Sequence, residues 1–315
     1  MTALWHESAA RSALRPSTPA PATDLLPVAA RFSMISTGTE RLVALGEVPA
    51  QAHDAMRVPN MDGAFSFPIK YGYSLVGHDG DGRALHCLHP HESTAWVDAS
   101  DVVELPASAP LDRMAMTSNL ETALNATWDA SLSTGCTAVI CGFGTLGALL
   151  ALTMRLRYDA EAVIVERDTY RASLARSLGF ETVGEMSAPD QFPRLFNTSG
   201  TQSGLQWCLD HAAFESQIIE LGWYGTKPVS VSLGGAFHFN RVRLISSQVG
   251  HVAASRRGEL SRRDRRAEAV DLLTDDAFDD LPRTRVPLNE VPRFFDTLRN
   301  GTLPQGLAWI IDYGD

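Results

Sequence analysis

Glycines and one carboxylate are the residues whose spacing first indicates chemistry in this chain. Residues 138–141 are apolar, and the segment that follows them is Gly142-Phe143-Gly144-Thr145-Leu146-Gly147. In a strand–turn–helix context, the first glycine permits a tight turn, the second lets a diphosphate approach the backbone, and the third lets helix and strand pack closely. The helix start, with Thr145 and Leu146, then offers backbone amides to the phosphates. The spacing predicts a dinucleotide-binding segment.

An acidic residue stands where such a segment needs one. Glu166 follows the apolar residues 162–165, about twenty positions after the glycines, where a carboxylate can accept hydrogen bonds from a ribose diol. Glu166 would repel a 2′-phosphate and so favours NAD over NADP. Arg167 and Arg171 are close in sequence, and guanidinium groups can bind that phosphate. We therefore expect NAD(P) as the cofactor, with NAD favoured.

The elements that must position these residues alternate as in a parallel sheet with crossover helices. We expect strands at 137–141, 162–165 and 242–247, and helices at 146–156 and 169–178. The first third of the chain has a different pattern. Extended segments at 26–35 and 95–105 are separated there by prolines and glycine turns, which favours a small β-barrel or β-sandwich. The expected fold class is α/β, with a barrel-like domain interrupted by a doubly wound parallel-sheet domain.

Composition and charge narrow the class of partner. The chain has 315 residues, which exceeds a usual single domain, and its net charge of −10 argues against nucleic acid and anionic membranes as partners. The arginine-rich segment 256–266 contains interleaved acids, so we interpret it as a solvated helix surface. The uncharged stretch 137–154 is near the shortest membrane span, but its glycines favour a strand that runs into a helix.

The cysteines and the N-terminal residues bear on location. The four cysteines include no Cys-x-x-Cys pair, so neither a structural zinc lobe nor a redox dithiol is indicated. Four free thiols fit a reducing cytosol, although four cysteines can also form two disulfides. The N-terminal residues carry charges and no apolar run, unlike a signal peptide. We expect a cytoplasmic protein.

Several motifs together resemble the medium-chain dehydrogenase/reductase superfamily of zinc-type alcohol dehydrogenase-like proteins. They are residues 35–40 (Ile-Ser-Thr-Gly-Thr-Glu), 70–77, 119–123, the glycine run and 246–250. The Ser-x-Gly-Thr-Glu motif is similar to threonine-dehydrogenase-like and bacteriochlorophyllide-dehydrogenase-like proteins. The resemblance implies a GroES-like catalytic domain at 1–122 and 247–315, and an inserted Rossmann domain at 123–246. It also implies a homodimer and a substrate cleft between the domains.

The chain departs from this family where zinc is usually bound. Zinc enzymes of the family have cysteine near Ser36 or Thr37, His-Glu at the places of Tyr73 and Ser74, and cysteine or an acid near Ser118. Neutral hydroxyls are poor zinc ligands, so the resemblance implies a member without zinc. A rival metal site is the cluster His86, Cys87, His89 and His91, but we interpret it as a loop between barrel strands because its spacing does not favour a tetrahedral set.

A site without metal needs hydrogen-bond donors and a proton carrier where negative charge develops on oxygen. The resemblance suggests Tyr73 as the donor, Thr39 as part of a proton relay, and Asn119 and Glu121 beside the nicotinamide. Thr122 is similar to a residue that packs against the nicotinamide ring. Plain structural roles remain open: Tyr73 filling the space of the lost metal, Glu40 as a structural carboxylate, and Glu121 in a buried ion pair.

The motifs favour a zinc-independent NAD(P)-dependent oxidoreductase that moves hydride to or from a small organic alcohol or ketone. Two alternatives stay open. An enone or quinone reductase needs less stabilisation of the negative charge on the substrate oxygen, because its acceptor is conjugated. A cofactor-binding sensor or scaffold without turnover would explain the loss of zinc ligands with no obvious replacement acid.

Overall fold

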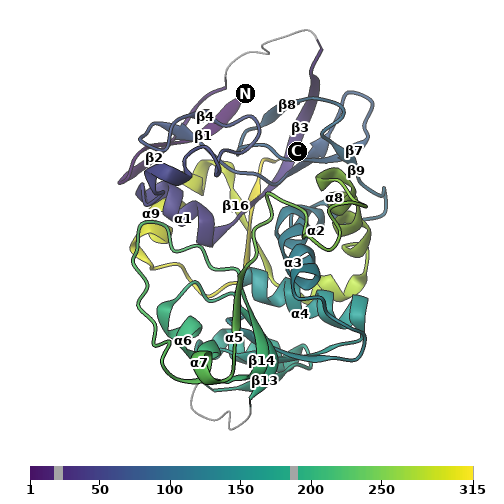
Figure 1. Ribbon diagram of the computed structural model, residues 1–315. Helices are drawn as coiled ribbons and strands as arrows, with labels where there is room; N and C mark the ends of the chain where they lie inside the picture. Colours follow the sequence, from purple (N-terminus) through teal and green to yellow (C-terminus); the bar gives the residue numbers. More distant parts are fainter. Residues whose placement is uncertain (18–23, 185–190, 315) are drawn as a thin grey trace. The chain divides into compact units, whose positions relative to one another are not determined.

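The computed structural model describes residues 1–17, 24–184 and 191–314 (Figure 1). The chain divides into two compact units, Met1–Ser118 with Leu273–Asp315, and Asn119–Leu272. The second unit interrupts the first in sequence. It extends beyond the expected Rossmann domain, residues 123–246, at both ends. The extension includes α8 (Arg262–Leu272), because Arg265 of this helix is hydrogen-bonded to Glu121.

The first unit contains a mainly antiparallel sheet with strand order β16-β17-β3-β6-β7-β9, and β8 also pairs with β3. Its strands are β3 (Leu26–Ile35), β6 (Leu75–His78), β7 (Ala84–Cys87), β8 (Thr94–Val97), β9 (Val103–Glu104), β16 (Arg283–Pro287) and β17 (Ala308–Asp312). Val28, Leu75 and Leu85 pack together inside it. The strand expected at 26–35 is confirmed. The single strand expected at 95–105 is wrong, because Asp98 accepts hydrogen bonds from Ser100 and turns the chain between β8 and β9.

A second sheet of this unit has the order β2-β1-β5-β4. Its strands are β1 (Thr2–Ser8), β2 (Arg11–Pro16), β4 (Asp62–Gly63) and β5 (Ile69–Lys70). The helical segments are α1 (Thr37–Leu45), η1 (Ala50–Ala52), α2 (Leu111–Met114), η2 (Asp276–Asp280), η3 (Leu288–Glu290) and α9 (Val291–Asn300). The apolar face of α9 packs on Leu4, Ile35 and Trp309, which joins the two sheets through one core.

The second unit contains a parallel sheet with the order β12-β11-β10-β13-β14-β15. Its strands are β10 (Thr137–Cys141), β11 (Glu161–Val165), β12 (Glu181–Val183), β13 (Phe192–Asn197), β14 (Ala212–Glu220) and β15 (Arg243–Ser246). Its helices are α3 (Thr117–Asp129, which begins in the first unit), α4 (Thr145–Tyr158), α5 (Thr169–Ser177), α6 (Gln202–Asp210), α7 (Ala236–Phe239) and α8. This is the doubly wound Rossmann order, and the predicted fold class is confirmed.

The uncharged stretch 137–154 divides into β10 and the first part of α4, as predicted. All residues of α4 from Gly147 to Met154 are buried, which explains why the helix lacks a polar face there. Within the described part of the chain, no helix combines the length and apolar character that crossing a bilayer requires. All four cysteines are free thiols.

Candidate functional site

The turn after β10 depends on glycine at its first and third positions. Gly142 has a φ of +101°, and a Cβ there would lie 2.9 Å from the backbone of Ser199. Only glycine adopts this conformation without strain and without that collision. A Cβ on Gly147 would lie 2.1 Å from the carbonyl oxygen of Gly142, so the start of α4 packs directly on the turn.

Gly144 stands on the open side of the same turn. It is the N-cap residue of α4, and a Cβ built on it meets nothing closer than the guanidinium of Arg171, at 3.8 Å. Gly144, Thr145 and Leu146 are partly exposed, whereas Gly142 and Gly147 are buried. The residues that begin α4 are therefore partly exposed, and an arginine side chain lies near Gly144.

Glu166 reaches the turn from the end of β11. Its carboxylate accepts the N–H of Phe143 at 2.7 Å and the N–H of Asp168 at 2.8 Å. A carboxylate can accept about four hydrogen bonds, so both oxygens keep capacity for a ligand hydroxyl. Arg167 is exposed beside it. The structure thus brings Glu166 and Arg171 to the glycine-rich turn.

Sequence reasoning missed the polar residues at the ends of β13 and β14. Thr198 donates to the carbonyl oxygen of Gly142 at 2.8 Å, and the buried Asn197 donates to the carboxylate of Glu220 at 2.8 Å. Burial raises the pKa of Glu220. The strand order sets β13 beside β10, which brings these carboxyl ends to the edge that holds the glycines. The Asn-Thr-Ser run after an apolar segment was the available signal.

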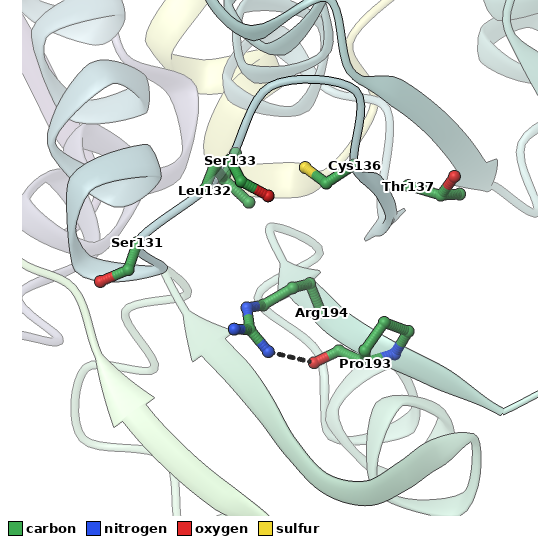
Figure 2. Close-up of a pocket in the computed structure, with 7 residues that line it drawn as sticks. All are labelled: Ser131, Leu132, Ser133, Cys136, Thr137, Pro193 and Arg194. Carbon is green, nitrogen blue, oxygen red and sulfur yellow. Dashed lines mark hydrogen bonds between the residues drawn. The ribbon is translucent and has the colours of Figure 1, made fainter.

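A pocket of about 350 Å³ lies at the opposite edge of this sheet. Figure 2 shows it between the start of β10, with Cys136 and Thr137, and the start of β13, with Pro193 and Arg194. The Arg194 guanidinium donates to the carbonyl oxygen of Pro193 at 2.9 Å. Ligands of open parallel sheets bind at the carboxyl ends of the strands, so this pocket is not the dinucleotide site.

Tyr73 belongs to the first unit and is half-buried. Its hydroxyl is hydrogen-bonded to the side chains of Ser36 and Thr39, at the start of α1. Burial, followed by the charge of Glu40, raises the pKa of Tyr73 to about 12. The phenol is therefore protonated at neutral pH and can act as a hydrogen-bond donor. The structure brings together two of the predicted catalytic residues, Tyr73 and Thr39.

Four further residues of the first unit are joined by short hydrogen bonds that sequence reasoning did not predict. Glu40 Oε2 lies 2.7 Å from His91 Nε2, and His91 Nδ1 lies 2.8 Å from Ser33 Oγ. Ser33 Oγ lies 2.8 Å from Tyr313 Oη. A Cβ on Gly72 would lie 3.0 Å from the His91 ring, so glycine is needed there to admit the imidazole. The four residues are spread over most of the chain, so spacing gives no signal for them.

No family model matches the chain. It is 25% identical over 138 residues to an uncharacterized zinc-type alcohol dehydrogenase-like protein of Haemophilus influenzae, which is 40% of each chain. It is 26% identical over 116 residues to alcohol dehydrogenase-like 1 of Arabidopsis thaliana, which is 35% of this chain and 30% of that protein. The matches thus cover less than half the length of these curated relatives.

Likeness to solved structures extends over the whole chain. Galactitol-1-phosphate dehydrogenase from Escherichia coli has a TM-score of 0.80 at 15% identity, over 99% of this chain and 100% of that one. A protein described as a zinc-binding dehydrogenase from Sinorhizobium meliloti, bound to NADP, has a TM-score of 0.77 at 17% identity, over 99% and 98%. An alcohol dehydrogenase from E. coli CFT073, complexed with NADH, has a TM-score of 0.77 at 13% identity, over 99% of each. The chain therefore has the fold of these dehydrogenases over its whole length.

The resemblance to zinc enzymes places metal ligands near Ser74 and Ser118, and the side chains found there do not fit the metal. Ser74 Oγ and Ser118 Oγ lie 3.1 and 3.4 Å from His86 Nε2. Both hydroxyls also donate to backbone carbonyls, Ser74 to Ala115 and Ser118 to Tyr73. One imidazole and two engaged neutral hydroxyls do not form the thiolate and imidazole set that Zn²⁺ prefers.

The interpretation of the histidine-rich segment as a loop is wrong for His86 and Cys87, which lie in β7 because they pair with β6. The histidines of this segment belong to different hydrogen-bond networks. His86 faces Ser74 and Ser118, His89 contacts the Pro90 carbonyl at 3.0 Å, and both ring nitrogens of His91 are engaged by Ser33 and Glu40. Burial lowers the pKa of His89 to about 4. Among the described residues, no three His, Cys, Asp or Glu side chains are arranged to hold a metal ion.

The remaining predicted site residues lie on α3 and have different surroundings. Glu121 is buried, and its Oε1 accepts from Arg265 Nε at 3.0 Å and Nη2 at 2.9 Å. Asn119 is buried, and Thr122 is half-buried. The interpretation of 256–266 as a solvated surface is wrong for Arg265 and Arg266, which are 1% and 6% exposed, because Glu121 requires a buried counter-charge.

Proposed function

We propose that the protein is a zinc-independent NAD(P)-dependent oxidoreductase that transfers hydride to or from a small organic alcohol or ketone. The observation that carries this proposal is the open face at Gly144. The residues that begin α4 are partly exposed there, and the nearest group that a Cβ at Gly144 would meet is the Arg171 guanidinium, at 3.8 Å. A diphosphate fits such a place, because amides and arginine both favour negative charge.

NAD is the favoured cofactor in this proposal. Glu166 is oriented by two backbone N–H donors and has capacity for a ribose diol. Arg171 is assigned to the diphosphate, because its guanidinium lies near Gly144. The other proposed contacts are those of the sequence analysis: Gly142, Thr145, Leu146, Gly147, Arg167 and, at the nicotinamide ring, Thr122. One structural neighbour is complexed with NADH and another is bound to NADP, which supports a nicotinamide cofactor of either kind.

Tyr73 is the proposed donor to the reacting oxygen. A bound reduced nicotinamide would supply hydride for a carbonyl carbon of the substrate. The Tyr73 hydroxyl would give its proton to the carbonyl oxygen. Thr39 and Ser36 orient this hydroxyl, which remains protonated at neutral pH. The proposed place of Asn119 is still beside the nicotinamide. We leave Glu121 out of the reaction, because Arg265 occupies its carboxylate.

Independence from zinc is supported by the chemistry of the residues at the family's zinc positions. Ser74 and Ser118 are hydroxyls that already donate to carbonyl oxygens, so they are poor replacements for thiolate or carboxylate ligands. We also propose a cytoplasmic location, which the four free thiols support, and a homodimer, which rests on the family resemblance.

The test is turnover with and without chelator, monitored by the absorbance of reduced nicotinamide over a panel of alcohols, ketones, enones and quinones. We expect Tyr73→Phe to lower turnover by about 100-fold while the cofactor Kd stays unchanged. Tyr71→Phe is the matched control, because Tyr71 is a buried neighbour whose ring contacts that of Tyr73. Failure to bind either cofactor, or stoichiometric zinc whose removal abolishes turnover, would contradict the proposal.

The panel also separates the alternatives. Turnover confined to enones or quinones would identify the reductase, whose conjugated acceptor depends less on Tyr73. Tight cofactor binding without an absorbance change for any substrate would favour the sensor or scaffold.

A further inference from the structure

The buried guanidinium of Arg265 uses all of its hydrogen-bond donors. Two acceptors lie on α3: Glu121 Oε1 accepts from Nε at 3.0 Å and from Nη2 at 2.9 Å, and Asn125 Oδ1 accepts from Nη1 at 2.6 Å. Two more are backbone carbonyl oxygens, because Nη1 donates to His251 at 3.0 Å and Nη2 donates to Val249. A guanidinium has five N–H groups, and these five hydrogen bonds engage every one of them. Arg265 therefore joins α3 to the segment that follows β15.

This segment, residues 247–253, is here called the β15 loop. α3 also holds the loop at its two ends. Ser247 Oγ donates to Asp129 Oδ2 at 2.7 Å, and the N–H of Ala253 donates to Asn125 Oδ1 at 2.9 Å. Between these ends, the guanidinium binds the two carbonyl oxygens. The path of the loop thus depends on one buried cation and on the α3 residues around it.

The β15 loop lies at the edge of the sheet where a dinucleotide is expected. The strands of the order β12-β11-β10-β13-β14-β15 are parallel, so the segments after β10, β11 and β15 all lie at the carboxyl edge. Glu166, the proposed ribose ligand of the ADP half, follows β11, and β15 lies on the opposite side of β10. A dinucleotide extends across both halves of a doubly wound sheet. Its nicotinamide half therefore lies on the side of β13, β14 and β15.

Exposure along the β15 loop fits a segment that faces a ligand. Gln248 and His251 are exposed, and Val249 and Gly250 are half-buried. Gln248 Oε1 accepts the N–H of Gly250 at 2.7 Å, which tightens the turn at this point. The carbonyl oxygens of the loop are thus anchored in the protein, while these residues remain accessible from solvent.

We propose that Arg265 is a positioning residue for the nicotinamide half of the cofactor, and this proposal rests on the proposed function. Its guanidinium holds the β15 loop in the shape that this half contacts, so the loop needs no ordering when the cofactor binds. Glu121 and Asn125 act through Arg265. Glu121 compensates the buried charge, and Asn125 holds both the guanidinium and the end of the loop. Glu121 thereby contributes to cofactor binding without contact with the reacting atoms.

The test compares the binding of NADH and of ADP-ribose, which has the adenosine, diphosphate and ribose groups but no nicotinamide. The full chain carries Glu121→Gln together with Arg265→Met, which removes both charges and leaves no unpaired carboxylate in the core. The glutamine keeps an oxygen for Arg266, whose Nε lies 3.6 Å from Glu121 Oε2. Calorimetric titration should show that the Kd of NADH rises about tenfold, whereas that of ADP-ribose changes less than about twofold.

Arg155→Met is the matched control. Arg155 donates to the carbonyl oxygen of Leu178 at 2.9 Å, so it is also an arginine that holds a backbone carbonyl. It lies in the last turn of α4, a helix that begins at the carboxyl edge of the sheet, so its contact is at the opposite edge. Both ligands should bind this variant as they bind wild type.

Asn125→Ala is a second test variant, because it leaves the ion pair of Glu121 and Arg265 in place. It should weaken NADH binding by about three- to tenfold and leave ADP-ribose binding unchanged. A general loss of structure would weaken both ligands alike, so equal weakening of the two would overturn the proposal, as would unchanged NADH affinity in both test variants. Wild type that binds neither ligand would overturn the proposed function itself, and this inference with it.

Discussion

The carboxylate of Glu166 accepts the backbone N–H of Phe143 at 2.7 Å, which ties the end of β11 to the middle of the glycine-rich turn after β10. The same carboxylate accepts from Asp168, the N-cap residue of α5. A negative group is thus fixed next to Gly144 by donors that belong to the backbone. Its position does not depend on a flexible counter-ion.

Removal of this carboxylate should change cofactor preference. We expect Glu166→Ala to weaken NADH binding by at least about tenfold, because a hydrogen-bonded charged group is lost, and to weaken NADPH binding much less. Fluorescence titration of both reduced cofactors measures the ratio. Glu161→Ala, at the exposed start of the same strand, is the control. Wild-type protein that binds NADPH more tightly than NADH would contradict the assigned preference.

The glycines of the turn should separate binding from folding. Gly147→Ala places a Cβ 2.1 Å from the Gly142 carbonyl oxygen and should destabilise the fold by about 1–3 kcal/mol. Gly144→Ala meets no atom closer than 3.8 Å, so it should melt like wild type yet bind reduced cofactor at least about tenfold more weakly, since the methyl group occupies the space of the diphosphate. Thermal melts and fluorescence titrations test both. Unchanged cofactor affinity in Gly144→Ala would place the diphosphate elsewhere.

The ion pair of Glu121 with Arg265 should support stability. Arg265→Met leaves a buried carboxylate without its main partner, which should lower the free energy of unfolding by about 3–5 kcal/mol. Urea unfolding of the variant and of wild type measures this difference in the free energy of unfolding. The control is Arg241→Met, which removes the exposed pair with Glu215 and should cost less than about 1 kcal/mol. Similar losses in the two variants would show that the buried pair is not a structural brace.

The free energy of unfolding should decrease as the pH is lowered, because His6 is buried in its neutral form. Burial, then Arg299 and His91, lower the pKa of His6 from 6.5 to about 3, so the imidazole is neutral in the folded protein. The unfolded chain binds this proton first, so the contribution is complete above pH 6.5 and is lost as pH falls toward 3. Each such group contributes a slope of about 1.4 kcal/mol per pH unit within its window.

His89 adds a second slope of the same sign, because burial lowers its pKa from 6.5 to about 4. The free energy of unfolding, measured with urea at several pH values between 7 and 4, should therefore fall less steeply with pH in His6→Asn than in wild type. His78→Asn is the control, because His78 is exposed and its removal should leave the wild-type slope. Parallel losses of stability in wild type and His6→Asn would exclude His6 as a source of the acid sensitivity.

The sequence by itself determined the parts whose partners lie nearby in the chain. The strand at Thr137–Cys141, the three glycines and the acid at Glu166 lie within one strand–helix–strand unit, and the structure has them in the predicted order. Their positions follow from local rules, because glycine, an apolar run and helix periodicity each limit the backbone directly. The departures at Ser74 and Ser118 were also visible in sequence, since they are differences of residue type.

Only the tertiary structure decided which polar residues are buried and with what. Arg265 is typical of an exposed helix by its neighbours in sequence, yet Glu121, far away in the chain, holds it in the core. Ser33 and His91 come from different strands and loops, and Tyr313 joins them from the end of the chain. A polar group is stable in the core only when other segments supply its hydrogen-bond partners. Here those segments are distant in sequence, so residue spacing does not indicate them.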